Sequence, residues 1–276
     1  MKKSEISFSI ITVTLNAKKE LSKTINSIQK QNYNSFTHII KDGFSNDQTS
    51  KIDFSKYRNT EFYQFKDKGV YDAMNQAFEL AKNEYIIFLN AGDIFFSKNS
   101  LKELAENIKK NPDFNAYSGG TLQVNLEEKS IKRIIGNGNL YKYLPLAQLP
   151  HPSFVIKNSI LSKLQNPFDS NLRIASDYKQ QLTLRKKGLW KTCYLNQIIS
   201  IMPIGGISTS NKVSIINGFK ETFFISLKIY KFLTPYILLM KIILNFYSKL
   251  KVLKFNGIKI NYGDCIFKNQ IKLFKF

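Results

Sequence analysis

Apolar and polar positions follow two different periods over roughly the first 110 residues. Short runs rich in β-branched and aromatic residues occur at 8–15, 38–41, 61–65 and 85–89. Between them, apolar residues recur at intervals of three and four, as in Leu21, Ile25 and Ile28, which is typical of one face of a helix. Strand and helix patterns that alternate in this way predict a doubly wound α/β fold with a mostly parallel sheet.

The run Tyr85-Ile86-Ile87-Phe88-Leu89 is apolar without interruption. Such a run suits a strand that is buried on both faces in the middle of a parallel sheet. Asn90-Ala91-Gly92-Asp93 follows at once, and the carboxyl end of a central parallel strand is where an open α/β sheet binds its ligand. Asp93 offers a hard oxygen ligand for a divalent cation. The alternative is an ordinary turn, because Asn, Gly and Asp are common turn residues.

The pattern changes after about residue 110. Residues 117–135 alternate as a β-hairpin does, and Pro150-His151-Pro152 predicts a stiff turn into a strand at 153–156. Residues 176–187 have a helical pattern that Ser176 can cap.

From about residue 212 onward the chain is basic and rich in apolar and aromatic side chains. This stretch has twelve lysines against Glu221 and Asp264, and no window of 18 residues lacks a lysine, so a transmembrane span is not expected. A basic amphipathic helix suits the surface of an anionic membrane, and the alternative is a helical subdomain that packs on the core with its lysines in water. We therefore divide the chain into a domain at 1–211 and a membrane-associating tail at 212–276.

The whole chain of 276 residues has a net charge of +21, so it requires an anionic partner. Nucleic acid, anionic lipid and a phosphorylated substrate all meet that requirement, and charge does not choose among them. Cys193 and Cys265 form no spaced set and are expected to be free thiols in a reducing compartment. The opening residues alternate as in a strand and not as in a signal peptide, so we expect a cytoplasmic location.

Polar side chains follow three of the predicted strands, at 12–16, 42–47 and 90–93. A carboxylate after the second strand suits a base or ribose, and one after the central strand suits a metal ion on a pyrophosphate. The sequence has no GxGxxG after its first strand and no GxxxxGK[ST], which argues against a dinucleotide site and a P-loop. A nucleotide-sugar site remains.

Four segments stand in order along the chain: Ser9-Ile10-Ile11-Thr12-Val13-Thr14-Leu15-Asn16, Lys41-Asp42-Gly43-Phe44-Ser45-Asn46-Asp47-Gln48-Thr49, Asp67-Lys68-Gly69-Val70-Tyr71-Asp72-Ala73-Met74-Asn75 and Leu89-Asn90-Ala91-Gly92-Asp93. Together they resemble the family 2 inverting glycosyltransferases of the GT-A fold, and most of all the bacterial branch that builds colanic-acid-like and other surface polysaccharides. The resemblance covers roughly residues 6–210. It implies an enzyme that moves a sugar from a nucleoside diphosphate, with UDP expected, to a lipid-linked glycan at the inner face of the cell membrane.

By resemblance, seven residues are assigned to the nucleotide sugar: Thr12, Asn16, Asp42, Asp67, Asp72, Asn75 and Asn90. The family's Asp-x-Asp metal motif is reduced here to Asn90-Ala91-Gly92-Asp93. Asp93 is therefore the one ionic ligand that the motif keeps for Mg²⁺ or Mn²⁺.

The segment Ile174-Ala175-Ser176-Asp177-Tyr178 resembles the one that carries the catalytic base in this family. Inverting transfer needs a carboxylate that takes a proton from the acceptor hydroxyl, and Asp177 is the candidate. The alternative is an Asp that complements the dipole in a first helical turn. Asp169 is the nearest acidic competitor. His151 and Ser208 are expected on the acceptor or phosphate side, and a hydrogen-bonded structural histidine is an equal alternative for His151.

Two other function classes are compatible with parts of the sequence. A sugar nucleotidyltransferase shares the sheet plan, but it opens with a glycine-rich basic loop that this chain lacks. A nucleic-acid-binding protein interleaves aromatic and basic residues on a binding face. Here the aromatic residues gather in the tail beside long aliphatic runs, which suits lipid better. The expected partners are thus a nucleotide sugar, a lipid-linked glycan and an anionic membrane, and not nucleic acid.

Overall fold

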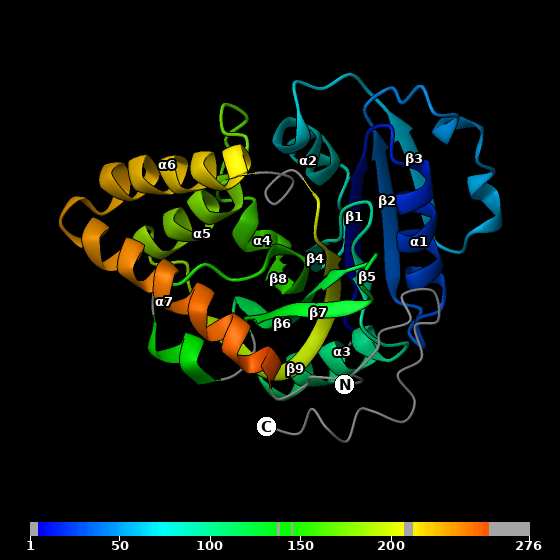
Figure 1. The fold of residues 1–276 in the computed structure, drawn as a ribbon. Coiled ribbons are helices and arrows are strands. Elements are labelled where there is room, and N and C mark those ends of the chain that lie inside the picture. Colours follow the sequence, from blue (N-terminus) through cyan, green and yellow to red (C-terminus); the bar gives the residue numbers. More distant parts are fainter. Residues whose placement is uncertain (1–4, 137–138, 145, 207–211, 254–276) are drawn as a thin grey trace.

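The computed structural model describes residues 5–136, 139–144, 146–206 and 212–253. Its first part alternates strands and helices in the predicted order: β1 (Phe8–Thr14), α1 (Lys18–Gln29), β2 (Phe36–Asp42), β3 (Thr60–Gln64), α2 (Val70–Glu79) and β4 (Tyr85–Phe88). These strands lie in the order β3-β2-β1-β4, and each neighbouring pair is parallel (Figure 1). Their carboxyl ends therefore meet at one edge of the sheet, which confirms the predicted α/β fold.

The second part extends the same sheet with mixed pairings. Its elements are β5 (Ile94–Phe95), α3 (Ser100–Lys110), β6 (Ala116–Asn125), β7 (Ser130–Ile135), β8 (Phe154–Lys157), α4 (Asn158–Leu161), α5 (Ser176–Lys186) and β9 (Thr192–Pro203). Strand β8 is antiparallel to β4 and β6, and β9 is parallel to β6. The predicted hairpin is confirmed as β6 and β7. Short 3₁₀ turns lie at Thr49–Lys51, Phe54–Lys56, Asn139–Tyr143, His151–Ser153 and Lys231–Leu233.

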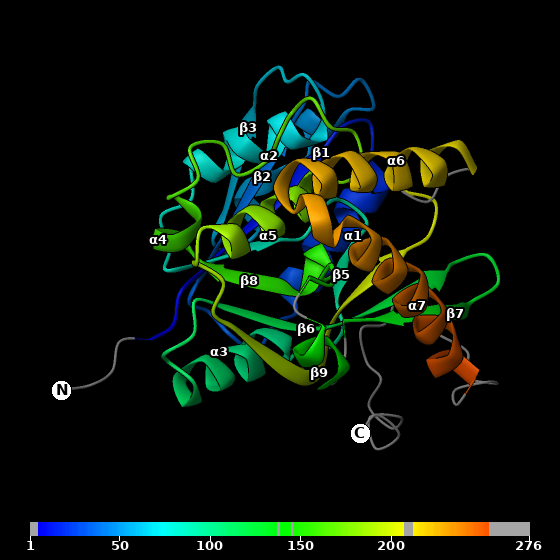
Figure 2. The same ribbon diagram turned by 90° about the vertical axis from the view of Figure 1, so that its left-hand side faces the viewer.

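Helices cover both faces of the sheet. On one face Ile28 of α1 and Leu104 of α3 pack with Ile10 of β1, and on the other Met74 of α2 and Leu184 of α5 pack with Ile86 of β4. Figure 2 shows α2 and α3 on opposite sides of the strands. Because both faces of β4 are covered, all four of its residues are buried, which is what an unbroken apolar run predicts.

The expected capping role of Ser176 is wrong. Ser176 is the first residue of α5, and the cap position belongs to Ala175, which has no side-chain cap. The Ser176 hydroxyl instead accepts the backbone N–H of Asp169 at 2.6 Å. It fastens the preceding loop to the helix.

Two C-terminal helices, α6 (Lys212–Ile229) and α7 (Thr234–Leu253), pack against the rest of the protein. Ile225 of α6 and Ile237 of α7 share a buried cluster with Tyr178 and Leu182 of α5. Farther along α7, Leu244 joins the main core. Within the described residues, no helix combines the length and apolarity that a membrane span needs. The division of the chain at 211 and 212 stays a prediction.

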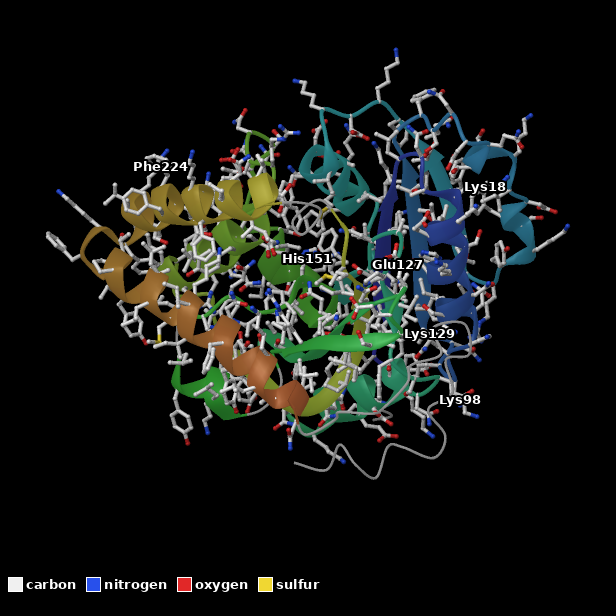
Figure 3. The ribbon with its side chains drawn as sticks, viewed as in Figure 1. Lys18, Lys98, Glu127, Lys129, His151 and Phe224 are labelled. Atoms are coloured by element: carbon white, nitrogen blue, oxygen red, sulfur yellow. The ribbon has the colours of Figure 1, made fainter. Side chains whose placement is uncertain are left out.

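The outward side of these two helices is more apolar than the inward side. Buried positions include Gly218, Thr222, Ser226, Thr234 and Ser248 beside Ile225, Ile237 and Leu244. The exposed side carries Val213, Ile215, Ile216, Phe223, Phe224, Leu227, Phe232, Leu233, Tyr236, Leu239, Ile242, Ile243, Phe246 and Leu250, here called the outer apolar face. Phe224 stands on the outside of α6 in Figure 3. A surface helix of a globular protein has the opposite arrangement.

Candidate functional site

Thr12 lies inside the sheet and not on its surface. Its side chain is fully buried, and its hydroxyl donates to the Leu89 carbonyl oxygen at 2.7 Å and lies 2.9 Å from Nε2 of His38. These contacts tie β1 to its two neighbours, β2 and the end of β4. The Thr12 hydroxyl thus makes its contacts within the sheet, and its expected role in nucleotide binding stays a prediction.

Asp42 and Asn16 organise the loop that follows β2. The Asp42 carboxylate is fully buried and accepts the Ser45 N–H at 3.0 Å, the Gln64 side-chain amide at 2.8 Å and the Ser45 hydroxyl. Asn16 accepts the Asn46 N–H at 2.7 Å through its side-chain oxygen, and its own N–H donates to the Ser45 hydroxyl at 2.7 Å. The ends of β1 and β2 are thereby joined, with Asn16 exposed at the edge.

Asp67 pairs with a buried lysine. Its carboxylate forms an ion pair with Lys41, whose side chain is fully buried, and it accepts the Gly69 N–H at 3.0 Å. Gly43 lies so close that a Cβ there would stand 2.7 Å from Oδ2 of Asp67. The absence of a side chain at Gly43 is what lets the β2 loop and the Asp67 loop pack together.

Asp72 and Asn75 also have partners within the protein. The Asp72 carboxylate accepts the Lys68 N–H at 2.8 Å and the Gln76 amide at 3.2 Å, which closes the start of α2. Asn75 makes a two-way contact with the backbone of Phe168, donating at 2.7 Å and accepting at 3.0 Å. It therefore anchors the segment that carries Asp169.

Asn90 and Asp93 lie in the turn that follows β4. The Asp93 N–H donates to the Asn90 carbonyl oxygen at 2.9 Å, while the Thr24 hydroxyl accepts the Gly92 N–H at 2.9 Å and donates to the Asp93 carbonyl oxygen at 2.8 Å. The side-chain oxygen of Asn90 is buried and has no hydrogen-bond partner among the described atoms. The backbone therefore forms a turn, as the alternative interpretation predicts. The hydrogen bonds of that turn do not involve the side-chain oxygen of Asn90.

Burial raises the pKa of the Asp93 carboxyl to about 8, and the backbone N–H of Asn90 opposes that rise in part. None of the ion pairs within the described residues includes Asp93. A bound cation would supply the missing compensation for this carboxylate. Asp93 and the unpartnered Asn90 oxygen are both hard oxygen donors, so they fit a Mg²⁺ or Mn²⁺ ion that takes its remaining ligands from phosphate and water. No group of three or more His, Cys, Asp or Glu side chains arranged for a metal occurs in the described part of the chain.

An aromatic cluster joins the end of β4 to the loop before α5. The His151 ring stacks on Phe88 at a centroid distance of 5.1 Å and meets Phe168 edge-on at 5.6 Å, and Tyr71 stacks on Phe168 at 5.9 Å. Burial lowers the pKa of His151 to about 4, so the ring is neutral near pH 7. Figure 3 places His151 between the C-terminal helices and the parallel strands. Its packing favours the structural alternative, and an acceptor or phosphate contact stays a prediction.

Asp177 is the second residue of α5 and is half-buried. Its carboxylate accepts the Gln148 side-chain amide at 3.1 Å and the Tyr178 N–H at 2.8 Å. Burial raises the pKa of Asp177 to about 6, against smaller effects of these hydrogen bonds and of the Lys241 charge. A carboxyl with a pKa near neutrality, held by hydrogen bonds and free of a direct ion pair, is suited to proton transfer.

Asp169 differs from Asp177 in its partners. It forms an ion pair with Lys179. Burial alone raises the pKa of Asp169, but the hydrogen bond from Lys179 and that from the Asn171 backbone lower it overall. A paired carboxylate with a lowered pKa is a weaker proton acceptor, which favours Asp177 of the two.

Residues 9–163, more than half of the chain, match the family described as Glycosyl transferase family 2. The chain belongs to this family. The match supports transferase activity and leaves the nucleotidyltransferase and nucleic-acid alternatives without support.

Relatives of this glycosyltransferase act in glycan biosynthesis. This chain is 24% identical over 208 residues to a PGL/p-HBAD biosynthesis glycosyltransferase of Mycobacterium bovis, and the match covers 74% of this chain and 79% of the relative. A shorter match, 30% identical over 105 residues, links 36% of this chain to 18% of the poly(ribitol-phosphate) beta-N-acetylglucosaminyltransferase TarS of Staphylococcus aureus.

Solved structures share the fold of this glycosyltransferase. The crystal structure of S. aureus TarS 1–349 in complex with UDP-GlcNAc has a TM-score of 0.66 at 18% identity, covering 92% of this chain and 76% of that one. The mannosyltransferase PcManGT from Pyrobaculum calidifontis, in complex with GDP-Man and Mn²⁺, has a TM-score of 0.60 at 13% identity, covering 92% and 77%. These likenesses confirm the GT-A-like fold.

Sequence reasoning missed three residues of the glycosyltransferase that surround Asp177: Gln148, Glu221 and Lys241. Glu221 and Lys241 lie in the segment that we interpreted as a membrane-associating tail. A signal for Glu221 was present, because it is the one acidic residue among seven lysines between 212 and 253. Ser208 lies outside the described residues, and its expected role stays a prediction.

Proposed function

We propose that this enzyme transfers a sugar from a UDP-sugar to a lipid-linked glycan, with inversion, in the synthesis of a bacterial surface polysaccharide. The observation that carries the proposal is Asp177: a half-buried carboxyl with a pKa of about 6 at the start of α5, which is hydrogen-bonded and takes part in none of the ion pairs of the described residues. Inverting transfer needs such a group close to the acceptor hydroxyl.

In the proposed step the acceptor oxygen attacks the anomeric carbon of the donor sugar. The Asp177 carboxylate takes the proton of that hydroxyl as the new bond forms. The bond from the anomeric carbon to the diphosphate breaks on the opposite side, and UDP leaves with the electron pair. The configuration at the anomeric carbon is inverted as a result.

The leaving diphosphate needs positive charge nearby. Asp93 and the side-chain oxygen of Asn90 are the residues that would hold Mg²⁺ or Mn²⁺, which would neutralise the developing charge on the phosphate oxygens when bound. The PcManGT complex contains Mn²⁺, which supports a metal in this fold. Asn16, exposed beside the loop after β2, is the best placed of the predicted nucleotide-binding side chains.

UDP is favoured as the nucleotide by the TarS likeness, since that protein was crystallised with UDP-GlcNAc and with UDP. PcManGT was crystallised with GDP-Man, so GDP is the competing choice. Calorimetric titration with UDP, GDP and CDP in the presence of Mn²⁺ distinguishes them.

The outer apolar face supports an anionic membrane as the surface on which the enzyme meets its acceptor. Phe232 is 89% exposed, and Phe224 and Phe246 are each 65% exposed. Contiguous exposed apolar side chains of this kind mark a binding surface. Exposed lysines on and between the same helices, among them Lys228 of α6 and Lys231 of the 3₁₀ turn that follows it, suit anionic headgroups, and each adds about 1 kcal/mol of attraction near such a surface.

The test of the catalytic proposal is Asp177→Asn, with Asp169→Asn as the matched control. Release of UDP is measured with UDP-glucose, UDP-galactose and UDP-GlcNAc, with and without lipid extracts as acceptor source. Asn keeps the size of Asp but not its basic carboxylate, so we expect turnover to fall by about 10²–10⁴ with UDP binding retained. Near-normal turnover of Asp177→Asn together with loss in Asp169→Asn would assign the base to Asp169.

The membrane proposal is tested by replacing Phe224, Phe232 and Phe246 together with serine and measuring flotation with vesicles. Burial of one phenylalanine is worth about 1.5–3 kcal/mol, and 1.4 kcal/mol is a factor of ten, so the triple variant should lose at least about a hundredfold in partitioning to phosphatidylglycerol vesicles. Serine substitutions are preferred to removal of 212–276, because Ile225, Ile237 and Leu244 are part of the buried core. Equal flotation of the variant and the unmodified protein would show that the outer apolar face does not bind the membrane.

A further inference from the structure

Glu221 reaches from α6 into the loop that precedes Asp177. One of its carboxylate oxygens accepts the Arg173 N–H at 2.9 Å, and the other accepts the N–H groups of Ile174 at 2.9 Å and Ala175 at 2.8 Å. Three consecutive backbone donors thus converge on one carboxylate. Hydrogen bonds to an ionised acceptor are about twice as strong as neutral ones, so this contact determines the path of the loop.

The loop is held from two further directions at Ile174. The Tyr71 hydroxyl of α2 donates to the Ile174 carbonyl oxygen at 2.6 Å. Gly218, one turn before Glu221 on α6, lies so close that a Cβ there would be 3.1 Å from Cγ2 of Ile174. The backbone that leads directly into Asp177 is therefore fixed between α2 and α6.

Helix α7 completes the surroundings of Asp177 through Lys241. Its ammonium donates to the Thr222 hydroxyl and lies 3.5 Å from the Gly218 carbonyl oxygen, so it bridges α7 to α6. Burial lowers the pKa of Lys241 to about 8, while the charges of Asp177 and Glu221 oppose that change. Among the described charged and titratable groups, Lys241 of α7 and Tyr71 of α2 interact with Asp177, and the charge of Glu221 on α6 acts on both of them.

We propose that Glu221 is a positioning residue for the base Asp177, so that the helices bearing the outer apolar face also hold the catalytic carboxylate in place. This inference rests on the proposed function. A displacement of about 1 Å at a reacting group can lower the rate about 10²-fold. Because the three hydrogen bonds of Glu221 hold the loop that leads into Asp177, their loss should reduce turnover.

The experiment compares Glu221→Ala and Glu221→Gln with Lys220→Ala, the adjacent exposed position on the same helix. UDP release from the UDP-sugar that the unmodified enzyme turns over, UDP affinity and the pH dependence of kcat are measured in each. We expect kcat of Glu221→Ala to fall about 10- to 100-fold, with KM for the donor and UDP affinity unchanged. Glu221→Gln should recover part of the loss, because its amide oxygen still accepts N–H groups. Lys220→Ala should match the unmodified enzyme when both are assayed without lipid, where the attraction of this lysine to anionic headgroups plays no part.

The pH profile separates positioning from a merely structural role. The acidic limb of kcat follows the protonation of Asp177, whose pKa is about 6. Burial is what raises that pKa, and loss of the Glu221 hydrogen bonds should let water reach Asp177, so the acidic limb should move to lower pH in Glu221→Ala, by less in Glu221→Gln, and stay in place in Lys220→Ala. Hydrogen exchange of the amides at 173–175 should accelerate in Glu221→Gln, in which the fold is otherwise kept.

The proposal is overturned if Glu221→Ala retains the kcat of Lys220→Ala, or if kcat and UDP affinity fall together with loss of cooperative melting. Unchanged exchange at 173–175 in Glu221→Gln would also overturn it. Failure of this proposal can be told apart from failure of the proposed function. If Asp177→Asn keeps its activity, Asp177 is not the base and the proposed function fails. An inactive Asp177→Asn with a fully active Glu221→Ala removes only the role of Glu221.

Discussion

The acidic residues of this glycosyltransferase fall into two regions that treat their carboxylates in opposite ways. At the end of β2 and from the loop after β3 to the first turn of α2, Asp42, Asp67 and Asp72 each accept hydrogen bonds from nearby backbone or side-chain groups or form an ion pair. At the end of β4 and the start of α5, Asp93 and Asp177 lie half-buried outside every ion pair of the described residues, and burial raises the pKa of both.

The difference separates carboxylates that build the site from those that are available for chemistry. A carboxylate that is satisfied by internal donors stabilises the fold and has little remaining capacity for a ligand. One that is buried without compensation costs stability, and such a cost is typical of functional sites. All five residues were assigned to the site, Asp42 and Asp93 by their positions after strands as well as by the resemblance, so the division between them comes from their contacts and not from the motifs.

The largest effect that this comparison predicts is on stability, at the ion pair of Asp67 with Lys41. Replacement of Asp67 by Asn leaves the fully buried Lys41 without its counter-ion, and breaking a buried pair costs about 3–5 kcal/mol. The control is Asp53→Asn, whose pair with Lys56 is exposed on both sides and therefore contributes little to stability.

Urea unfolding of the two variants measures the difference. If Asp67→Asn is as stable as Asp53→Asn, the ion pair of Asp67 with Lys41 does not stabilise the fold. The contrast between the two groups of carboxylates would then be wrong for Asp67. A double replacement of Lys41 and Asp67 by apolar residues should recover stability, because no buried charge is then left unpaired.

The parallel half of the fold was predictable from the sequence because its pattern is local. The apolar run before Asn90 and the three-and-four spacing of Leu21, Ile25 and Ile28 give β4 and α1 directly. Strand β9 was not predicted, since its burial follows no alternation along its twelve residues. Its pairing with β6 depends on residues more than seventy positions away, which periodicity does not report.

The site was predictable in residue identity but not in contacts. Motif order selected Asp93 and Asp177, yet it also selected Thr12, whose hydroxyl is used inside the sheet. It could not find Glu221, because the contact with the loop at 173–175 joins segments 46 to 48 positions apart and depends on how α6 packs on α5. The tail was interpreted as basic and apolar, and although Glu221 is its one acidic residue between 212 and 253, the pattern did not indicate which way that carboxylate faces.

An effect that is smaller at pH 5, and grows as the pH rises, concerns Asp93, where removal of the charge should stabilise the protein. The pKa of Asp93 in the folded state is about 8, above its ordinary value of 3.8, so the folded state binds this proton more tightly than the unfolded state does. Below pH 3.8 both states are protonated and the carboxyl has no effect. Between pH 3.8 and 8 the unmodified protein loses stability as the pH rises, and Asn at this position does not titrate.

Asp93→Asn should therefore melt higher than the unmodified protein, by an amount that is small at pH 5 and grows to pH 8. A difference of 1 kcal/mol corresponds to about 2–4 °C in Tm for a chain of this general size. Mn²⁺ should raise the Tm of the unmodified protein at pH 8 but not that of Asp93→Asn, because the cation compensates the buried carboxylate. Asp113→Asn, at an exposed position, is the control. The measurement is a set of melting curves from pH 5 to 9 with Mn²⁺ or with EDTA. If the difference in Tm between the unmodified protein and Asp93→Asn is the same at every pH, or if Mn²⁺ raises both Tm values equally, Asp93 belongs with the carboxylates that only build the site.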